Sequence, residues 1–261
     1  MLTTHTHENL PGSSSLSAPW QNDTVEAGRQ CHGRLWSSLK EICDLLHVPS
    51  AHLCGDEELL FQHVQFKSGQ RIHTIGQAFE ALYLVHSGFL KTVLIDESGG
   101  EQVLHFPMKG DLLGVDGIHA QHYASEVEAL SECNLILLPF KKLMALGKTH
   151  PELENTIYDV LSQELVREQG MAGMLSAMGA EARVARFLLT MASRFEYMGY
   201  SGKLFNLRMT RHEIGSYLGL TLETVSRLFS RLQQEGIVRV QGREVTLLDP
   251  GALRQLCAAR E

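Results

Sequence analysis

The chain has 261 residues, of which 44% are hydrophobic and 20% are charged, a balance that is ordinary for a globular protein of one large or two modest domains. The apolar runs are far shorter than a membrane span, and the N-terminus lacks the charged start, apolar core and cleavage site of a secretion signal. These features argue against a membrane-spanning or exported protein, and we expect a cytoplasmic one with no membrane partner.

The charge is distributed unevenly along the chain. The net charge is −7, which by itself argues against a nucleic-acid partner, but residues 180–261 hold 12 Lys+Arg against 8 Asp+Glu while the rest of the chain holds 11 against 22. A basic C-terminal third on an acidic body is typical of a DNA-binding module attached to a sensing or dimerising module. An excess of this size is also common on ordinary solvated surfaces, so the charge alone does not decide between the two.

The N-terminal half changes character near residue 63. Residues 1–28 are rich in Thr, His, Ser, Asn and Pro and lack apolar periodicity, so we expect a disordered tail. Apolar spacing predicts a short amphipathic helix over 33–48 and a further helical piece over 55–62. From 63 to 140, short alternating runs broken by glycines, with a hairpin signal at Gly99-Gly100, predict an antiparallel barrel or jelly roll.

Helices and short strands alternate from there to the C-terminus. We expect helices over 140–146, 151–178 and 181–198, a strand over 205–207, two helices joined by a tight turn over 209–234, a hairpin of 238–240 with 245–247, and a last helix over 250–259.

The second helix of the pair has a polar face at its start. Thr221 is a good N-cap and places Glu223, Ser226 and Arg227 on one face of the first turns, with Leu222 beside them. The N-terminal turns of a recognition helix reach base edges in the major groove, where arginine binds guanine, a carboxylate accepts from cytosine and an apolar group contacts the thymine methyl. The alternative is that Glu223 and Arg227 form a surface ion pair four residues apart.

The rest of this helix pair fits the same interpretation. Gly219 is expected to make the turn, and Arg211, Arg231 and Arg243 are candidate phosphate contacts, which position a protein on DNA without specifying sequence. The apolar positions expected in the core are Ile214, Leu218, Leu220, Val225, Leu228 and Leu232.

The long helix offers a dimerisation stripe, because its apolar and acidic positions alternate in steps of three and four as in a coiled coil. The expected dimerisation residues are Ile157, Leu161, Glu164, Glu168, Met171, Leu175 and Met178. In a two-fold dimer Glu168 would approach its mate, and the like charges would repel. The alternative is that Glu168 points outward into solvent.

A barrel, a long helix and a helix-turn-helix, in this order, resemble the CRP/FNR family of bacterial transcription regulators, over about residues 35–255. The strings that carry the resemblance are 82–88 (LYLVHSG), 110–114 (GDLLG), 182–188 (ARVARFL) and, closest to the FNR branch of oxygen-sensing activators, MTR at 209–211, YLGLT at 217–221, ET at 223–224 and SRL at 226–228.

The resemblance implies an α+β fold with four parts. These are a disordered tail over 1–28, a cyclic-nucleotide-binding-type β-roll (jelly roll) sensor domain over 29–150, a dimerisation helix over 151–179 and a winged helix-turn-helix DNA-binding domain over 180–261. The resemblance also implies that the protein is not an enzyme. It implies a homodimeric regulator that reads TTGAT inverted repeats in double-stranded promoter DNA through Glu223, Ser226 and Arg227. A barrel hairpin near residues 96–101 would contact RNA polymerase, and Glu168 would hold the inactive form apart.

The resemblance says less about the signal. In the cyclic-AMP-binding branch an Arg-Ser pair holds the phosphate, but here residues 122–126 read HYASE, so the arginine is missing and a carboxylate stands nearby. In the FNR branch four cysteines hold a [4Fe-4S] cluster. Cys43 resembles the last of the three N-terminal ligands, whereas Arg34 and Ser37 stand at the other two positions. Cys133 lies about three residues early, and Ile136 stands where the barrel ligand is expected.

Several inputs therefore stay open. A non-standard cluster could be held by Cys31, Cys43, Cys54 and Cys133, although their spacing is not typical of clusters, and thiol redox could act at Cys31 or Cys43. The ordinary role for each is that of a buried structural cysteine. Five widely spaced cysteines predict no disulfide framework. The histidines that could bind haem are His73, His105 and His122.

Among these possibilities we favour a regulator that binds DNA without any cofactor, as FixK-type regulators do. An alternative function is a cyclic-nucleotide-type regulatory protein that serves an enzyme and binds haem or a non-standard cluster. The sequence shows no His-x-His grouping typical of a cupin-like metalloenzyme.

Overall fold

The computed structural model describes residues 35–46, 59–96, 99–149 and 151–258. The expected tail over 1–28 lies outside these ranges, and so do Cys31 and Cys54. No helix within the described residues is both long enough and apolar enough to cross a membrane.

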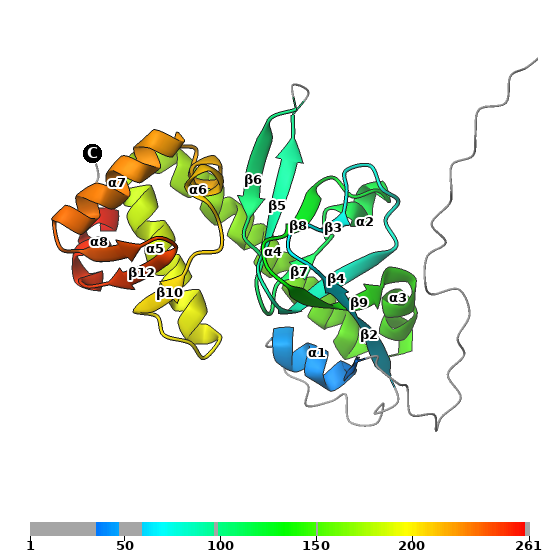
Figure 1. Ribbon diagram of the computed structural model, residues 1–261. Coiled ribbons are helices and arrows are strands. Elements are labelled where there is room, and N and C mark those ends of the chain that lie inside the picture. The colour runs from blue at the N-terminus through cyan, green and yellow to red at the C-terminus, as the bar shows by residue number, and fades with distance from the viewer. Residues whose placement is uncertain (1–34, 47–58, 97–98, 150, 259–261) are drawn as a thin grey trace, which may run out of the picture. The chain divides into compact units, whose positions relative to one another are not determined.

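Two antiparallel sheets form the N-terminal β-roll (Figure 1). The first has the order β1-β2-β9-β4-β7 and the second the order β3-β8-β5-β6. The strands are β1 (Trp36–Ser38), β2 (Leu60–Phe66), β3 (Arg71–His73), β4 (Ala81–Ser87), β5 (Leu90–Ile95), β6 (Glu101–His105), β7 (Leu112–Leu113), β8 (Glu126–Ala129) and β9 (Cys133–Pro139). The jelly roll expected from the alternating pattern is confirmed.

The centre of the first sheet explains why this part of the chain folds as it does. β4 and β9 are nearly continuous apolar runs, and they pair in the register Leu84 with Ile136 and Leu82 with Leu138. These four side chains are buried, and each such burial contributes roughly 1.5–3 kcal/mol. The core between the sheets therefore rests on the two most apolar strands of the chain.

Short helices accompany the β-roll. They are α1 (Leu39–Leu46), α2 (Gly117–Ala120) and α3 (Phe140–Thr149). The helix expected over 33–48 starts only at Leu39, because residues 36–38 pair with β2 and Ser38 then caps α1 by accepting a hydrogen bond from the Glu41 amide at 3.2 Å. The helical interpretation of 55–62 is wrong for residues 60–62, which begin β2, while α2 was not predicted because four residues show no periodicity.

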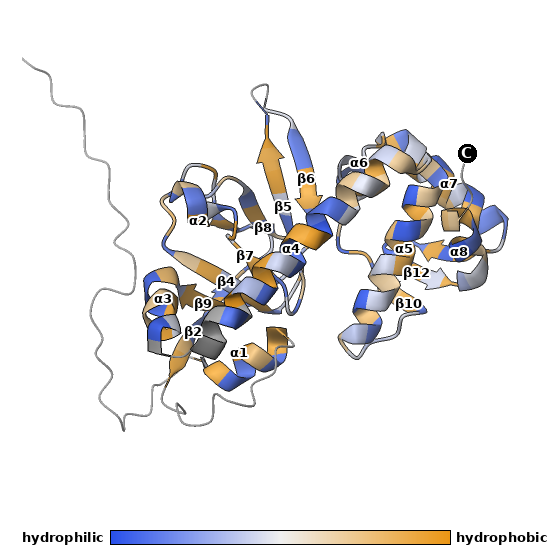
Figure 2. Cartoon of the chain, turned by 180° about the vertical axis from the view of Figure 1, so that it is seen from behind, coloured by the Kyte–Doolittle hydropathy of each residue, from blue (hydrophilic) through white to orange (hydrophobic). Residues whose placement is uncertain are grey.

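The C-terminal part consists of helices and a small sheet with the order β10-β12-β11. Its elements are α4 (Pro151–Ala177), α5 (Ala180–Tyr197), β10 (Leu204–Asn206), α6 (Arg211–Leu218), α7 (Leu222–Gln234), β11 (Val238–Gln241), β12 (Glu244–Leu247) and α8 (Pro250–Ala258). Figure 2 shows polar and apolar residues interspersed along α4, as expected of a helix with more than one covered or exposed face.

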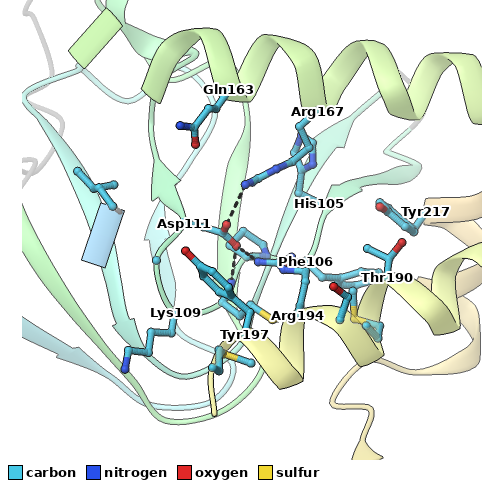
Figure 3. Close-up of a pocket in the computed structure, with 17 residues that line it drawn as sticks. His105, Phe106, Lys109, Asp111, Gln163, Arg167, Thr190, Arg194, Tyr197 and Tyr217 are labelled. Carbon is cyan, nitrogen blue, oxygen red and sulfur yellow. Dashed lines mark hydrogen bonds and ion pairs between the residues drawn. The ribbon is translucent and has the colours of Figure 1, made fainter. Parts of the chain in front are cut away.

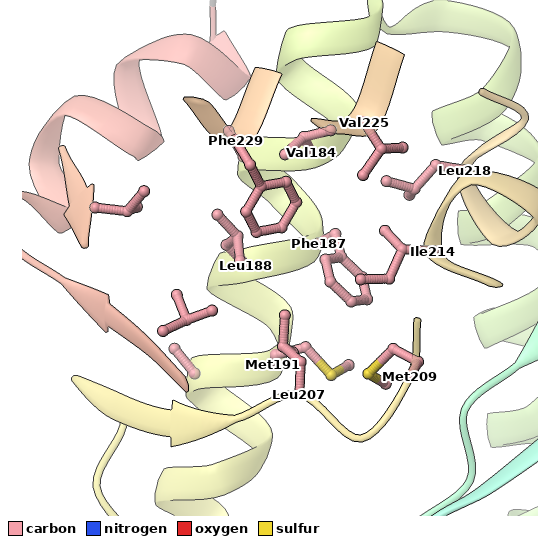
Figure 4. Close-up of a cluster of buried hydrophobic side chains, with 14 of the residues drawn as sticks. Val184, Phe187, Leu188, Met191, Leu207, Met209, Ile214, Leu218, Val225 and Phe229 are labelled. Carbon is pink, nitrogen blue, oxygen red and sulfur yellow. The ribbon is translucent and has the colours of Figure 1, made fainter. Parts of the chain in front are cut away.

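One apolar cluster joins α5, α6 and α7 (Figure 4). Phe187 and Leu188 of α5 lie against the buried faces of the helix pair and of the small sheet. Of the six apolar positions expected in this core, Ile214, Leu218, Val225, Leu228 and Leu232 are buried, and Leu220 is partly buried. The helix-turn-helix is thus held by one continuous core, which leaves the opposite face of α7 free.

Candidate nucleic-acid interface and sensor cavity

The first helix of the pair, α6, begins with a capping box. The Thr210 side chain accepts from the Glu213 amide at 3.2 Å, and the Glu213 carboxylate accepts from the Thr210 amide at 2.7 Å. Gly219 ends the helix in the left-handed region with φ 63°, which confirms its expected place in the turn. A side chain at Gly215 would come within 2.6 Å of the Leu220 carbonyl oxygen, so the turn packs directly against α6.

The start of α7 carries the polar face that the sequence predicts. Thr221 is the N-cap and its hydroxyl accepts from the Thr224 amide at 3.2 Å. Glu223, Ser226 and Arg227 are all exposed, and Leu222 is 43% exposed beside them. Within the described residues Glu223 and Arg227 are not paired with each other, so the alternative of a surface ion pair is not observed. The three polar groups are therefore available to a ligand.

The three arginines expected to contact phosphate have different surroundings. Arg231 is held by Glu235 at 2.9 Å and Glu181 at 3.2 Å, so two carboxylates already offset its charge. The Arg211 guanidinium lies 3.7 Å from the centre of the Phe229 ring. Arg243 is exposed and donates to the carbonyl of Arg208 at 3.1 Å. Arg231 is thus the least suited of the three to bind phosphate.

A set of contacts between β5, β6 and α6 was not predicted. Lys91 on β5 has a buried side chain that lies 3.3 Å from Glu213 Oε1, 3.4 Å from Glu101 and 3.5 Å from Glu128. Burial alone would raise the pKa of Glu213, but hydrogen bonds from Thr210 and the charge of Lys91 hold it below its usual value. The carboxylate of the capping box therefore also binds a lysine of the β-roll.

Ser216 of α6 contributes to the same contact. Its hydroxyl accepts from the Val103 amide at 2.8 Å and donates to the Glu101 carbonyl at 3.0 Å. These partners lie more than a hundred positions away in the sequence, and no motif signals their pairing. Sequence patterns predicted β6 and α6 but not this connection between them.

The expected dimerisation residues of α4 mostly face the chain's own clusters. Ile157 packs against the β-roll core, and Met171, Leu175 and Met178 pack against the core of the helix-turn-helix. The remaining apolar member, Leu161, lines a small apolar cavity with residues of α1 and β4. The physical reason is that a stripe with this spacing also suits packing onto the helix's own domain.

A face of α4 beside this stripe is more open. Tyr158, Leu165 and Val166 are 59%, 55% and 64% exposed, and Glu168 and Ala172 are exposed too. Glu164, in contrast, is half-buried, and its Oε1 atom lies 3.8 Å from Nε2 of His105. Of the seven expected residues, only Glu168 is exposed, and it lies among apolar residues that the sequence analysis did not select.

The β-roll contains a cavity of 420 Å³ between β-strand residues and α4. Ser125 lines it, whereas Glu126 is buried and paired with Arg71 at 2.7 Å. The acidic groups that line it are instead Asp116, Glu164 and Glu168. A cyclic phosphate here would meet three carboxylates, which agrees with the expectation that cyclic nucleotides are not bound in the usual mode.

A second cavity, of 460 Å³, is also lined by His105 and has a basic lining (Figure 3). Lys109, Arg167 and Arg194 line it, and Asp111 binds the last two: Arg167 at 3.1 Å and Arg194 through a short ion pair. Arg194 also donates to the Phe106 carbonyl at 3.1 Å. Asp111 thus joins the β-roll to both α4 and α5.

The two described candidate cysteines are buried. Burial raises the pKa of the Cys43 and Cys133 thiols, so both are protonated at neutral pH. Cys133 lies 3.3 Å from the Phe89 carbonyl and 3.2 Å from the Ser131 carbonyl, as a weak donor does. Neither environment activates a thiolate, and both fit the structural role better than thiol redox.

The three candidate haem ligands lie in three different settings. His73 is buried and stacked on Tyr123 with ring centres 3.9 Å apart, and burial lowers its pKa to about 4. His122 is exposed beside the Ala120 carbonyl. His105 is half-buried and lines both cavities. In both of these cavities His105 lies together with carboxylates.

Comparison with known proteins agrees with this arrangement. Residues 63–150 match the family model of the cyclic nucleotide-binding domain, and residues 182–256 match that of the Crp-like helix-turn-helix domain. Electron transport regulator A of Shewanella oneidensis is 38% identical over 87% of this chain and 89% of its own length. The fumarate and nitrate reduction regulatory protein of Escherichia coli K12 is 34% identical over 84% of this chain and 88% of its own.

A solved structure shows the same architecture. FixK2 from Bradyrhizobium japonicum is 27% identical, and it aligns with 78% of this chain and 100% of its own with a TM-score of 0.70. The relatives are transcription regulators and not enzymes, and the helix-turn-helix is the part of them that binds DNA. The chain therefore belongs to the CRP/FNR family of DNA-binding transcription regulators.

Proposed function

We propose that this protein is a homodimeric activator that reads an inverted repeat of TTGAT half-sites and controls genes of oxygen, redox or nitrogen-oxide metabolism. The observation that carries the proposal is the exposed row of Glu223, Ser226 and Arg227 at the N-terminal end of α7. The similar regulators of electron transport and of fumarate and nitrate reduction support this gene class. A promoter partner implies work in the cytoplasm.

Each of the three residues has a role in the proposed readout. Arg227 donates two hydrogen bonds to guanine, Glu223 accepts from a cytosine amino group, and Ser226 adapts to either. Leu222 contacts a thymine methyl, which its exposure allows. Arg211 and Arg243 bind phosphates and set the orientation of α7, while Arg231 adds little because its carboxylate partners remain in place.

The dimer proposal uses the open face of α4. A palindromic site requires a two-fold protein, and Tyr158, Leu165, Val166 and Ala172 give α4 an exposed apolar surface near Glu168. Of the dimerisation stripe predicted from the sequence, Glu168 lies at this surface, and the other members pack α4 onto its own domain. Two Glu168 side chains facing each other would weaken the dimer through repulsion.

Contact with RNA polymerase is proposed for the hairpin between β5 and β6. Asp96 accepts from the Gly100 amide at 2.8 Å, which orders the turn on both sides of residues 97–98, and these two lie outside the described residues. The side chain of Glu101 lies 3.4 Å from Lys91. The described strands of this hairpin are therefore supported from within the β-roll.

The proposal is tested by fluorescence anisotropy with a labelled duplex carrying the TTGAT inverted repeat and a matched duplex with both half-sites scrambled. Specific binding should exceed non-specific binding by about 10³-fold or more at one fixed salt concentration. Equal binding to the two duplexes, in air and under anoxic conditions, would contradict the proposal.

A further inference from the structure

Three potential metal ligands from two elements meet beside the acidic cavity. His105 is the last residue of β6, and Glu164 and Glu168 lie one turn apart on α4. One ligand atom from each of the three lies within 4.8 Å of those of the other two. In the part of the chain that the structure describes, this is the only such group of three His, Cys, Asp or Glu side chains.

The spacing suits an ion between the side chains. His105 Nε2 and Glu164 Oε1 are 3.8 Å apart, too far for a hydrogen bond. A divalent ion such as Zn²⁺ takes imidazole nitrogen and carboxylate oxygen at about 2.0–2.2 Å each, so two ligands of one ion lie at most about 4.4 Å apart. The exposed side chain of Glu168 is free to cover the remaining distance.

A neighbouring arginine orients one of the ligands. Arg167 binds Glu164 Oε2 at 3.1 Å, which leaves Oε1 facing His105, and it also binds Asp111 at 3.1 Å. Outer partners of this kind fix the orientation of metal ligands.

The charge around the group selects for a cation. The cavity of 420 Å³ that contains all three ligands is also lined by Asp116, and none of its described lining residues is Lys or Arg. The basic cavity that His105 also lines has the opposite character, with Arg167 and Arg194 in its lining. Three carboxylates, those of Glu164, Glu168 and Asp116, stand against the guanidinium of Arg167 that contacts Glu164, so a cation is favoured on the side where the three ligands meet.

We propose that His105, Glu164 and Glu168 bind a divalent transition-metal ion of the Zn²⁺ class, with water completing its coordination. One imidazole and two carboxylates form a mixed nitrogen and oxygen set that suits such an ion and leaves open positions. The ion connects β6 of the β-roll to α4. The bound ion also offsets the charge of Glu168, so we expect it to favour dimerisation. This regulatory consequence rests on the proposed dimer, whereas the binding of the ion does not.

Isothermal titration of the full chain with Zn²⁺ at pH 7 tests the binding. Glu164→Gln, Glu168→Gln and His105→Gln should each weaken one Zn²⁺ site by at least about tenfold. Asp159→Asn removes an exposed carboxylate from the same helix outside the group and should leave this affinity unchanged. Wild-type affinity in all three ligand variants, or an equal loss in Asp159→Asn, overturns the proposal.

The absorption spectrum of bound Co²⁺ separates this site from metal binding by the cysteines of the chain. Co²⁺ bound at the proposed site should give visible bands without thiolate charge-transfer absorption, and Glu168→Gln should remove them. Glu168 is exposed, so this variant retains its fold, as circular dichroism can verify. Co²⁺ absorption with thiolate bands that Glu168→Gln leaves intact contradicts the proposal.

The regulatory consequence is tested by sedimentation. Zn²⁺ should raise the dimer fraction of the wild-type chain but not that of Glu164→Gln. Zn²⁺ binding without any specific binding of the TTGAT duplex would refute the proposed function and leave the metal site standing. Specific DNA binding with no Zn²⁺ site would refute the metal site alone.

Discussion

The helix-turn-helix and the sensor cavity differ in how the chain brings their functional residues together. Glu223, Ser226 and Arg227 lie within two turns of one helix, and a cap and a turn at its start suffice to present them. The group at the cavity joins His105 of β6 to two residues of α4, far along the sequence. A candidate DNA-reading surface can therefore be recognised from a short string, whereas a group such as that of His105, Glu164 and Glu168 exists only once the domain has folded.

The largest expected effect tests whether the core behind α7 supports this surface. Leu232 is fully buried between α7 and its neighbours, so Leu232→Ala should cost about 2–5 kcal/mol of stability through lost burial and a cavity. Urea denaturation followed by circular dichroism measures the loss. Gln234→Ala, an exposed change in the same helix, should stay within about 0.5 kcal/mol of wild type. Equal stability of the two variants would mean that this core does not hold the helix pair.

A pH effect of similar size is expected in the sensor domain. Burial holds the pKa of His73 at about 4, while Asp116 and the Ser125 carbonyl act in the opposite direction. The unfolded chain takes up this proton near pH 6.5, so stability that is present above pH 6.5 is lost as the pH falls towards 4, by roughly 3 kcal/mol.

His73→Phe keeps an aromatic ring against Tyr123 but removes the titrating group. Denaturation midpoints measured from pH 7 to pH 4 should therefore fall less steeply in this variant than in the wild-type chain. If both chains lose stability in parallel, another group causes the acid sensitivity.

The next effect concerns base discrimination by α7. Arg227→Ala should lose about 1–3 kcal/mol of discrimination at the guanine of TTGAT, which is about 5-fold to 150-fold in relative affinity. Binding to duplexes with that base pair replaced measures it. Arg231→Ala is the matched control, because Arg231 lies on the same helix but is engaged with Glu181 and Glu235. A variant at position 227 that still prefers guanine would assign the readout to another residue.

The sequence predicted regular elements well and their mutual contacts poorly. The strands of the β-roll, the helix pair and the turn at Gly219 follow from periodicity and turn chemistry, which are local. The orientation of α4 did not follow, because a stripe with three-and-four spacing fits both a partner and the helix's own domain. Likewise, Lys91 gave no sign that it pairs with Glu213, since only the fold brings the two together.

The smallest expected effect compares the two helix caps. Thr210→Ala and Thr221→Ala each remove a side chain that accepts from a helix amide, and each should cost about 1 kcal/mol. Only Thr210 also binds the carboxylate of Glu213, which in turn binds Lys91 of the β-roll. Thr210→Ala should therefore also loosen the contact between α6 and β6, and Thr221→Ala should not.

Hydrogen exchange resolves this difference. The Val103 amide, which donates to Ser216 of α6, should exchange faster in Thr210→Ala than in Thr221→Ala, whereas the α7 amides should exchange faster only in Thr221→Ala. Equal protection of Val103 in both variants would mean that Glu213 holds its position without the cap. In that case Lys91 and Ser216 would hold the β-roll against the helix pair without help from the cap, and the Thr210 side chain would serve only the local start of α6.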